Sequence, residues 1–173
     1  MQGNRLPLIS ADHPTLRKAA AKVADPAQVR DLAEDLLVTM KAEGGVGLAA
    51  PQVGRSVRLF VTGTGEQRVF INPEIIRASK ELIWWEEGCL SLPRLNGEVE
   101  RPKEVTVRAT GLDGKRFEVT ADQLYGRVLQ HEIDHLDGIL FPDRMADVSK
   151  VRTLTEEEWD SRFEKKKLHD EEM

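Results

Sequence analysis

The first long apolar pattern of the chain has the spacing of an amphipathic helix. Its members recur three or four positions apart, which places them on one helix face. They are Val29, Leu32, Ala33, Leu36, Leu37 and Met40. Asp25 is a suitable N-cap, Pro26 suits the first helical position, and Gln28 completes a capping box. Because Gly44-Gly45 ends the pattern, we expect a helix over about 26–42.

Short runs of β-branched and apolar residues follow a glycine-rich loop and predict strands. They cover Ser56–Thr62, Arg68–Asn72 and Glu81–Trp85. Further along, two alternating runs surround Asp113-Gly114, a dipeptide that favours a tight turn. The alternating residues are Val105, Val107 and Ala109, then Phe117 and Val119. We therefore expect a β-hairpin over 104–120.

Two further segments have the pattern of a capping box at a helix start. Thr120-Ala121-Asp122-Gln123 predicts a helix over about 121–137, which Gly138 ends. Thr155-Glu156-Glu157-Glu158 predicts a charged C-terminal helix. The strands thus lie together in the sequence with helices on either side, an order that favours the α+β class.

Composition narrows the choice of function. The 173 residues fit one domain, and an apolar content of 40% suffices for one core. A net charge of −5 argues against DNA as a partner. The single cysteine, Cys89, excludes an intramolecular disulfide and a zinc site of several cysteines. No apolar run approaches the roughly 18 residues of a membrane span, and residues 1–24 lack a secretory signal, so we expect a cytoplasmic location.

The sharpest chemical signal is His131-Glu132-Ile133-Asp134-His135. Residues four apart lie on one helix face, so both imidazoles can bind one metal ion. Glu132 is adjacent, close enough to handle the proton of a water on that ion. Leu124 and Val128 continue the stripe of the two histidines, which should therefore point inward.

A catalytic site of this kind usually has a third protein ligand and one open position. One candidate is Cys89, within Glu87-Gly88-Cys89-Leu90-Ser91; the alternative is a small buried hydrophobic residue. The other candidate is a carboxylate among Glu156–Glu158, an arrangement similar to zinc peptidases of the thermolysin type. The cap at Thr155 also accounts for those glutamates, since acidic residues suit a helix start.

A third segment is Gly45-Val46-Gly47-Leu48-Ala49-Ala50-Pro51-Gln52. It formally matches a dinucleotide fingerprint, but it follows a helix and runs into Pro51, so we reject that interpretation. Its glycines would let a peptide backbone approach closely. Taken in order, the three segments resemble the signature motifs of peptide deformylases. The resemblance covers 8–145, whereas 146–173 match less clearly.

The resemblance implies antiparallel strands around a central H-E-x-x-H helix, with an N-terminal and a C-terminal helix. It implies one domain over 1–173, with a core at 8–145 and a helical extension at 150–173. The implied activity is hydrolysis of the formyl group from the N-terminal formyl-methionine of new polypeptides, with release of formate. Lys165-Lys166-Lys167 could contact ribosomal RNA transiently, and the alternative is a solvated tail.

The resemblance also implies a divalent ion bound by Cys89, His131 and His135. Fe²⁺ is the usual ion, and Zn²⁺, Ni²⁺ or Co²⁺ can replace it. A thiolate suits such softer ions and argues against magnesium and calcium. A catalytic metal lowers the pKa of its water from 15.7 to about 7, and Glu132 would accept that proton and pass it to the leaving amine.

Two donors for the oxyanion follow from the resemblance, the side-chain amide of Gln52 and the backbone N–H of Leu90. The implied substrate pocket falls on Val46, Gly47, Trp85, Glu87, Gly88, Leu124, Arg127 and Val128. Arg101 matches an arginine that contacts the peptide in some members. The stem of Arg127 could line the pocket while its head stays wet. For Trp85 the alternative is core packing, and Asp134 either orients a histidine or forms a surface salt bridge.

Overall fold

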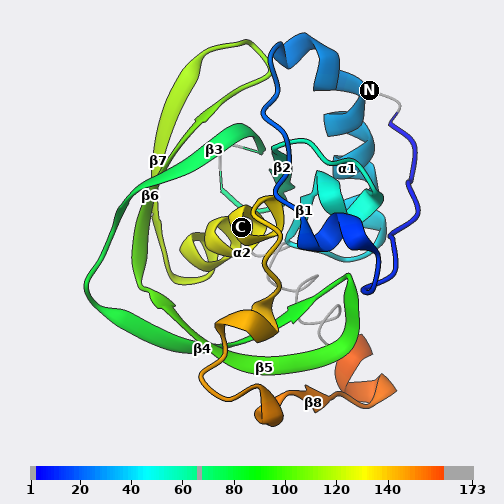
Figure 1. The fold of residues 1–173 in the computed structure, drawn as a ribbon, viewed down its shortest axis with the longest axis vertical. Helices are drawn as coiled ribbons and strands as arrows, with labels where there is room; N and C mark the ends of the chain where they lie inside the picture. Colours follow the sequence, from blue (N-terminus) through cyan, green and yellow to red (C-terminus); the bar gives the residue numbers. More distant parts are fainter. Residues whose placement is uncertain (1–2, 66–67, 162–173) are drawn as a thin grey trace.

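The computed structural model describes residues 3–65 and 68–161, whose strands form two antiparallel sheets (Figure 1). The larger sheet has the order β1-β2-β3-β6-β7 and the smaller sheet the order β4-β5-β8. The larger sheet comprises β1 (Gly47–Ala49), β2 (Leu59–Thr62), β3 (Val69–Ala78), β6 (Glu104–Thr110) and β7 (Arg116–Asp122). The smaller sheet comprises β4 (Leu82–Cys89), β5 (Leu92–Pro102) and β8 (Arg152–Thr153).

Two α-helices, α1 (Arg30–Ala42) and α2 (Gln123–Leu136), pack on these sheets. Single 3₁₀ turns link the elements at η1 (Pro14–Arg17), η2 (Pro26–Val29), η3 (Ala50–Val53), η4 (Phe141–Arg144) and η5 (Val148–Lys150). A further helical segment begins at residue 156 and continues to 161, where the described part of the chain ends. Within the described residues, no helix is long and apolar enough to cross a bilayer.

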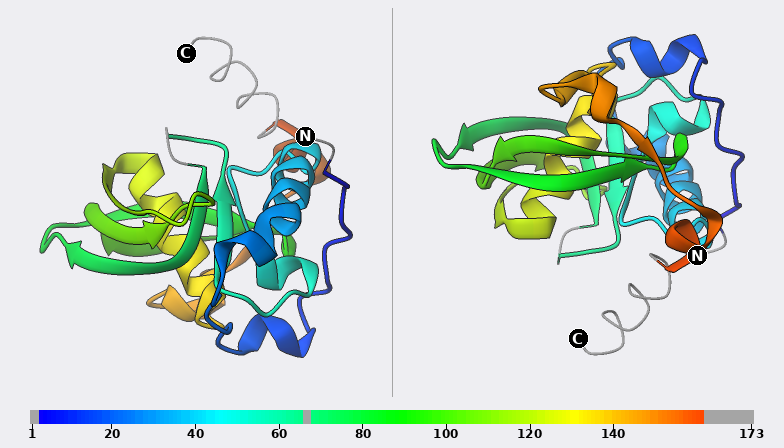
Figure 2. Two further views of the ribbon diagram at one scale, coloured as in Figure 1. Left: turned by 90° about the horizontal axis from the view of Figure 1, so that it is seen from above. Right: turned by 90° about the horizontal axis from the view of Figure 1, so that it is seen from below.

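Helix α2 occupies the middle of the molecule (Figure 1). Strands β6 and β7 lie on one side of it, α1 lies on the other, and the β4–β5 hairpin runs beneath. Seen from above and from below, α2 again lies between the strands and α1 (Figure 2). This is the α+β arrangement that the sequence predicts, with antiparallel strands around the H-E-x-x-H helix.

Two aliphatic clusters hold the helices to the larger sheet. Leu129, Ile133 and Leu136 of α2 pack against Phe60, Phe70 and their neighbours. Ala33, Leu36 and Met40 of α1 pack against residues of β1, β2 and β3 in a second cluster. Leu129 and Leu136 are fully buried, so each removes apolar surface from water and fixes the rotation of α2. The polar residues between them are thereby directed to a defined side.

The helix predicted over 26–42 is confirmed, although its first turn, η2, is 3₁₀ rather than α. Asp25 caps it, since its carboxylate accepts from the Ala27 N–H at 2.9 Å. The hairpin predicted over 104–120 is also confirmed, with Val107 opposite Val119. The capping box at Thr155 forms in both directions: the Thr155 N–H donates to Glu158, and the Glu158 N–H donates to Thr155 Oγ1.

The predicted start of the second long helix is wrong by two residues. Thr120 remains in β7, where its hydroxyl pairs across the hairpin with Thr106 at 2.9 Å, so it does not cap a helix. Helix α2 begins at Gln123 after Asp122, which makes no side-chain cap hydrogen bond. The cross-strand partner, which only the fold supplies, therefore outweighs the local capping pattern.

Three strands were not predicted. The shortest is β8, which pairs with β5 in a stretch where a helical extension over 150–173 was expected. The segment Gly47–Ala49, expected to be a loop, pairs with β2 as β1. Strand β5 runs for 11 residues although it contains Pro93, Gly97 and Pro102. Its pairing with β4, in which Trp85 lies opposite Val99, stabilises an extended conformation that its own composition does not favour.

Candidate active site

Helix α2 and the end of strand β4 bring three metal-binding side chains together. Cys89 Sγ lies 3.3 Å from His135 Nε2, and one donor atom each of Cys89, His131 and His135 lies within 4.8 Å of the others. Gln130 fixes this part of α2 to strand β5 by donating to the Pro102 carbonyl at 3.0 Å. Among the described residues this is the cluster suited to a metal, and Glu156–Glu158 are not part of it.

The donor set fits a softer divalent ion. Tetrahedral coordination by sulfur and imidazole nitrogen at about 2.3 and 2.0 Å would separate those two donors by roughly 3.5 Å. The observed 3.3 Å between Cys89 and His135 is close to that separation. Glu132 Oε2 is also buried without a hydrogen-bond partner, as expected for an oxygen that faces a further group bound at the site.

The imidazoles favour the ionised form of Cys89. Burial alone would raise the pKa of its thiol, but the charges and hydrogen bonds of His135 and His131 outweigh that effect. The pKa of Cys89 is therefore lowered well below its ordinary value. The thiolate is the form that binds a metal, so the two histidines favour the state of Cys89 in which it could act as a ligand.

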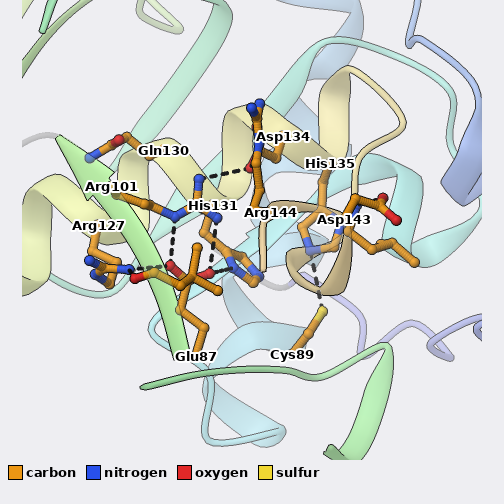
Figure 3. A network of polar contacts seen from close by, with 12 residues as sticks. Glu87, Cys89, Arg101, Arg127, Gln130, His131, Asp134, His135, Asp143 and Arg144 are labelled. Atoms are coloured by element: carbon orange, nitrogen blue, oxygen red, sulfur yellow. Dashed lines mark hydrogen bonds and ion pairs between the residues drawn. The ribbon is translucent and has the colours of Figure 1, made fainter. Parts of the chain in front are cut away.

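Glu87 orients His131 (Figure 3). Its Oε2 lies 3.0 Å from His131 Nδ1, while Arg101 binds both carboxylate oxygens at 2.6 and 2.9 Å and Arg127 binds Oε1 at 2.7 Å. Burial raises the pKa of Glu87, but hydrogen bonds from His131 and Arg101 reverse the shift and lower it. An ionised carboxylate only accepts, so His131 Nδ1 must donate, and Nε2 is the nitrogen left for the Cys89 side, where it could bind a metal.

Asp134 extends this network away from the histidines (Figure 3). Its Oδ2 accepts from Arg101 Nη1 at 2.8 Å and its Oδ1 from Arg144 Nη2 at 2.7 Å. Asp134 is buried, so the alternative of a surface salt bridge is wrong. It acts on a ligand histidine only through Arg101 and Glu87. Arg101 is itself only 4% exposed and engaged by two carboxylates, which does not support the expected contact with a peptide.

The expectation of a wet head for Arg127 is wrong. Its guanidinium is buried and donates to three oxygens, those of Glu87, the Val99 carbonyl at 3.0 Å and the Ile83 carbonyl at 2.8 Å. It also lies 6.0 Å from the ring of Trp85. Arg127 thus joins α2 to both strands of the β4–β5 hairpin, because a guanidinium can donate in several directions at once.

Glu132 has the surroundings of a proton acceptor. It is 4% exposed, and burial raises its pKa to about 7, against the opposing charges of the two histidines. Gly47 on strand β1 leaves room for it: a Cβ at Gly47 would lie 2.5 Å from Glu132 Oε1. A side chain at residue 47 would therefore displace Glu132 from its present position.

The amide of Gln52 is held in one orientation. Its Oε1 accepts from the Ala49 N–H at 2.9 Å, so the oxygen and nitrogen of the amide are distinguished. Its Nε2 then faces Ser91 Oγ at 3.0 Å and Cys89 Sγ at 3.6 Å. Ser91 belongs to the same motif as Cys89, but sequence reasoning gave it no role; nothing in its local pattern identifies its partner.

The remaining residues expected to line the substrate pocket differ in how exposed their side chains are. Val128 is buried on α2, whereas Trp85 and Leu124 are 40% and 41% exposed. Leu124 therefore lies at the open end of the stripe that carries the histidines. Half-exposed apolar side chains beside a polar cluster suit the wall of a pocket, and their contact with substrate remains a prediction.

Together, an α+β fold and a Cys-His-His donor set beside a buried glutamate define a candidate metallohydrolase. Residues 5–151 match the family model described as polypeptide deformylase. A peptide deformylase of Rhodopseudomonas palustris is 46% identical over 74% of this chain and 78% of its own length. One from Thermomicrobium roseum is 44% identical over 87% of this chain and 92% of its own. This chain belongs to the polypeptide deformylase family.

Solved structures agree with that assignment. The crystal structure of the Thermotoga maritima peptide deformylase superposes with a TM-score of 0.79 and 39% identity, over 83% of this chain and 99% of that one. The Synechococcus elongatus peptide deformylase, solved in complex with actinonin, gives a TM-score of 0.78 and 35% identity over 96% and 88% of the two chains.

Proposed function

We propose that the Cys89, His131, His135 and Glu132 cluster carries out the family's reaction in this chain. Family membership makes the chain a metal-dependent enzyme that removes the N-formyl group from nascent polypeptides. The observation that carries the residue assignment is the convergence of three metal donors within 4.8 Å, next to a glutamate with an unpartnered buried oxygen.

Cys89, His131 and His135 would hold the ion. When bound, a divalent ion supplies a Lewis acid and a water of lowered pKa. The thiolate favours Fe²⁺, with Zn²⁺, Ni²⁺ and Co²⁺ as substitutes, over magnesium or calcium. Glu87 accepts the Nδ1–H of His131, so Nε2 would be the ring nitrogen that binds the ion.

Glu132 would move the proton. Its pKa near 7 lets it accept a proton from water and return that proton to the leaving amine at neutral pH. Its carboxylate fills the space that Gly47 leaves by lacking a side chain. Because it is also buried, it would stay in one place through both transfers. General acid–base catalysis of this kind typically contributes about 10²–10⁴-fold to a rate.

Gln52 and Leu90 would stabilise the negative charge on the formyl oxygen. The Gln52 amide presents its N–H side to Cys89, and Leu90 directly follows Cys89 in the chain. Removing one oxyanion donor typically costs about 3–4 kcal/mol in the barrier. Val46, Trp85, Leu124 and Val128 would form the apolar wall that receives the methionine side chain, as the family resemblance implies.

The chain would act in the cytoplasm on N-formyl-methionyl peptides as they leave the ribosome. Lys165-Lys166-Lys167, on which the expected ribosome contact depends, lies outside the described residues. No contact with DNA or membrane is part of the proposal.

Formate release from a formyl-methionyl peptide tests the proposal. Glu132→Gln should lower kcat at least about 100-fold because it removes the proton acceptor. Its metal content should stay equal to that of the unsubstituted protein. Glu98→Gln, at an exposed position on the outer face of β5, is the matched control and should leave kcat unchanged. Full activity in Glu132→Gln, with metal bound, would refute the assigned role.

A further inference from the structure

Ser91 lies behind the Gln52 amide. It occupies the turn between β4 and β5, two positions after Cys89, and is only 2% exposed. Its Oγ accepts from Gln52 Nε2 at 3.0 Å. Buried hydroxyl groups generally have hydrogen-bond partners, and this one is matched to the residue proposed to stabilise the oxyanion.

The contacts of Gln52 fix where its two amide hydrogens point. The Ala49 N–H can only donate, so it must meet Oε1, and the NH₂ group faces the opposite side. One NH₂ hydrogen is occupied by Ser91. The other donates to Cys89 Sγ at 3.6 Å, at the edge of the metal cluster. The amide is therefore held at both ends, and its second N–H is aimed at the side of the cluster where the sulfur lies.

Without the Ser91 hydroxyl, the NH₂ group would keep only its contact with Cys89 Sγ, and the amide could swing about its last side-chain bond, a broad torsion, while Oε1 stays with the Ala49 N–H. The thiolate of Cys89 could then draw both donors of Gln52. An oxyanion donor is effective only when it is already aimed at the position where charge develops, since reorganisation during the reaction costs free energy. The Ser91 hydrogen bond supplies that preorganisation without contact to the substrate.

We propose that Ser91 is a positioning residue for catalysis: its hydroxyl oxygen holds one N–H of Gln52 so that the other stays directed at the formyl oxygen. The proposal rests on the function assigned above and adds a residue to it. Ser91 acts only through Gln52, so its contribution should disappear when Gln52 has no amide.

A double-mutant cycle tests this dependence, with formate release from a formyl-methionyl peptide as the assay. Ser91→Ala should lower kcat roughly tenfold, as expected for a lost hydrogen bond worth about 1.4 kcal/mol, and should leave KM within about twofold. In a Gln52→Ala background the same change should lower kcat less than about twofold. Ser91→Thr, which keeps the hydroxyl, should recover most of the activity.

Ser79→Ala is the matched control. Like Ser91, Ser79 accepts a hydrogen bond with its hydroxyl, here from the backbone N–H of Glu104 at 3.1 Å. It follows the end of β3, outside the cluster. It should leave kcat unchanged. Metal content and the thermal midpoint, measured for each variant, separate a loss of folding from a loss of rate.

Two outcomes would overturn the proposal. The first is an unchanged kcat in Ser91→Ala. The second is an equal fall of kcat from that change with and without Gln52, because Ser91 would then act on something other than the amide. Neither can be confused with failure of the proposed function, which would appear as absence of formate release from the metal-loaded unsubstituted protein.

Discussion

The fit between Gly47 and Glu132 predicts a variant that loses activity while keeping its fold. In Gly47→Ala the new Cβ would lie 2.5 Å from Glu132 Oε1 and 2.8 Å from the Cδ and Cγ atoms of the same side chain. The backbone of residue 47 does not have a positive φ, so alanine introduces no backbone strain there. The whole perturbation therefore falls on the carboxylate.

The size of the displacement follows from the structure. Ordinary van der Waals contact begins near 3.4 Å, so the carboxylate must withdraw by about 0.9 Å, the difference between 3.4 and 2.5 Å. A misplacement of about 1 Å at a reacting centre can lower a rate about 10²-fold. The cost in stability should be only about 1–2 kcal/mol, because the end of a flexible side chain moves rather than the backbone.

Steady-state formate release, metal analysis and urea unfolding together measure these effects. Gly47→Ala should lower kcat about 100-fold with KM nearly unchanged, with the metal retained. Gly63→Ala is the control: its Cβ would crowd only the flexible end of Met40 at 3.2 Å and meet two backbone carbonyls at an ordinary 3.8 Å, so activity should persist.

Two results would refute this reasoning about Gly47. One is full activity in Gly47→Ala. The other is a rise in KM with kcat intact, which would mean that the methyl group obstructs the peptide rather than Glu132. The double variant with Glu132→Gln should be no slower than Glu132→Gln alone, since the displaced group is then already inactive.

Three further predictions concern stability and metal binding. Arg101→Met should cost about 3–5 kcal/mol in urea unfolding because it removes the buried cation that two buried carboxylates share. Arg144→Met, at a half-exposed position, should cost about 1 kcal/mol or less; equal costs would contradict this. Gly138→Ala should cost about 2 kcal/mol, since φ is +74° and a Cβ would lie 2.7 Å from the Arg17 backbone; an unchanged midpoint would contradict it. Cys89→Ser should lose zinc on dialysis that the unsubstituted protein retains, because the softer ligand is gone; retained zinc would exclude the thiolate as a ligand.

The sequence placed the histidines correctly because helical geometry is local. His131 and His135 are four positions apart, and the apolar stripe formed by Leu129, Ile133 and Leu136 fixes which side of α2 is buried. The same holds for α1 and for the hairpin around Asp113-Gly114. In each case, residues within a few positions of one another determine the conformation.

Local patterns of this kind could not predict which strands and side chains would pair in the fold. The hydrogen bond of Thr120 to a neighbouring strand moved the start of α2, and strand β5 formed despite its prolines and glycine. The burial of Arg127 depends on three oxygens from two strands. The three oxygens that Arg127 binds lie 28 to 44 positions from it in sequence, so no local signal identifies them.

The sequence alone determined the helical periods, the spacing of the paired imidazoles and the presence of one cysteine. Those properties depend on bonds between near neighbours and on residue chemistry. The spacing of residues alone left Cys89 and the glutamates after Thr155 as alternatives, and the family resemblance favoured Cys89. Only the tertiary structure brought Cys89 next to the two histidines, turned the Gln52 amide toward Ser91, and surrounded Glu87 with two arginines. These choices depend on distances between residues 14 to 46 positions apart, which packing of the whole core sets.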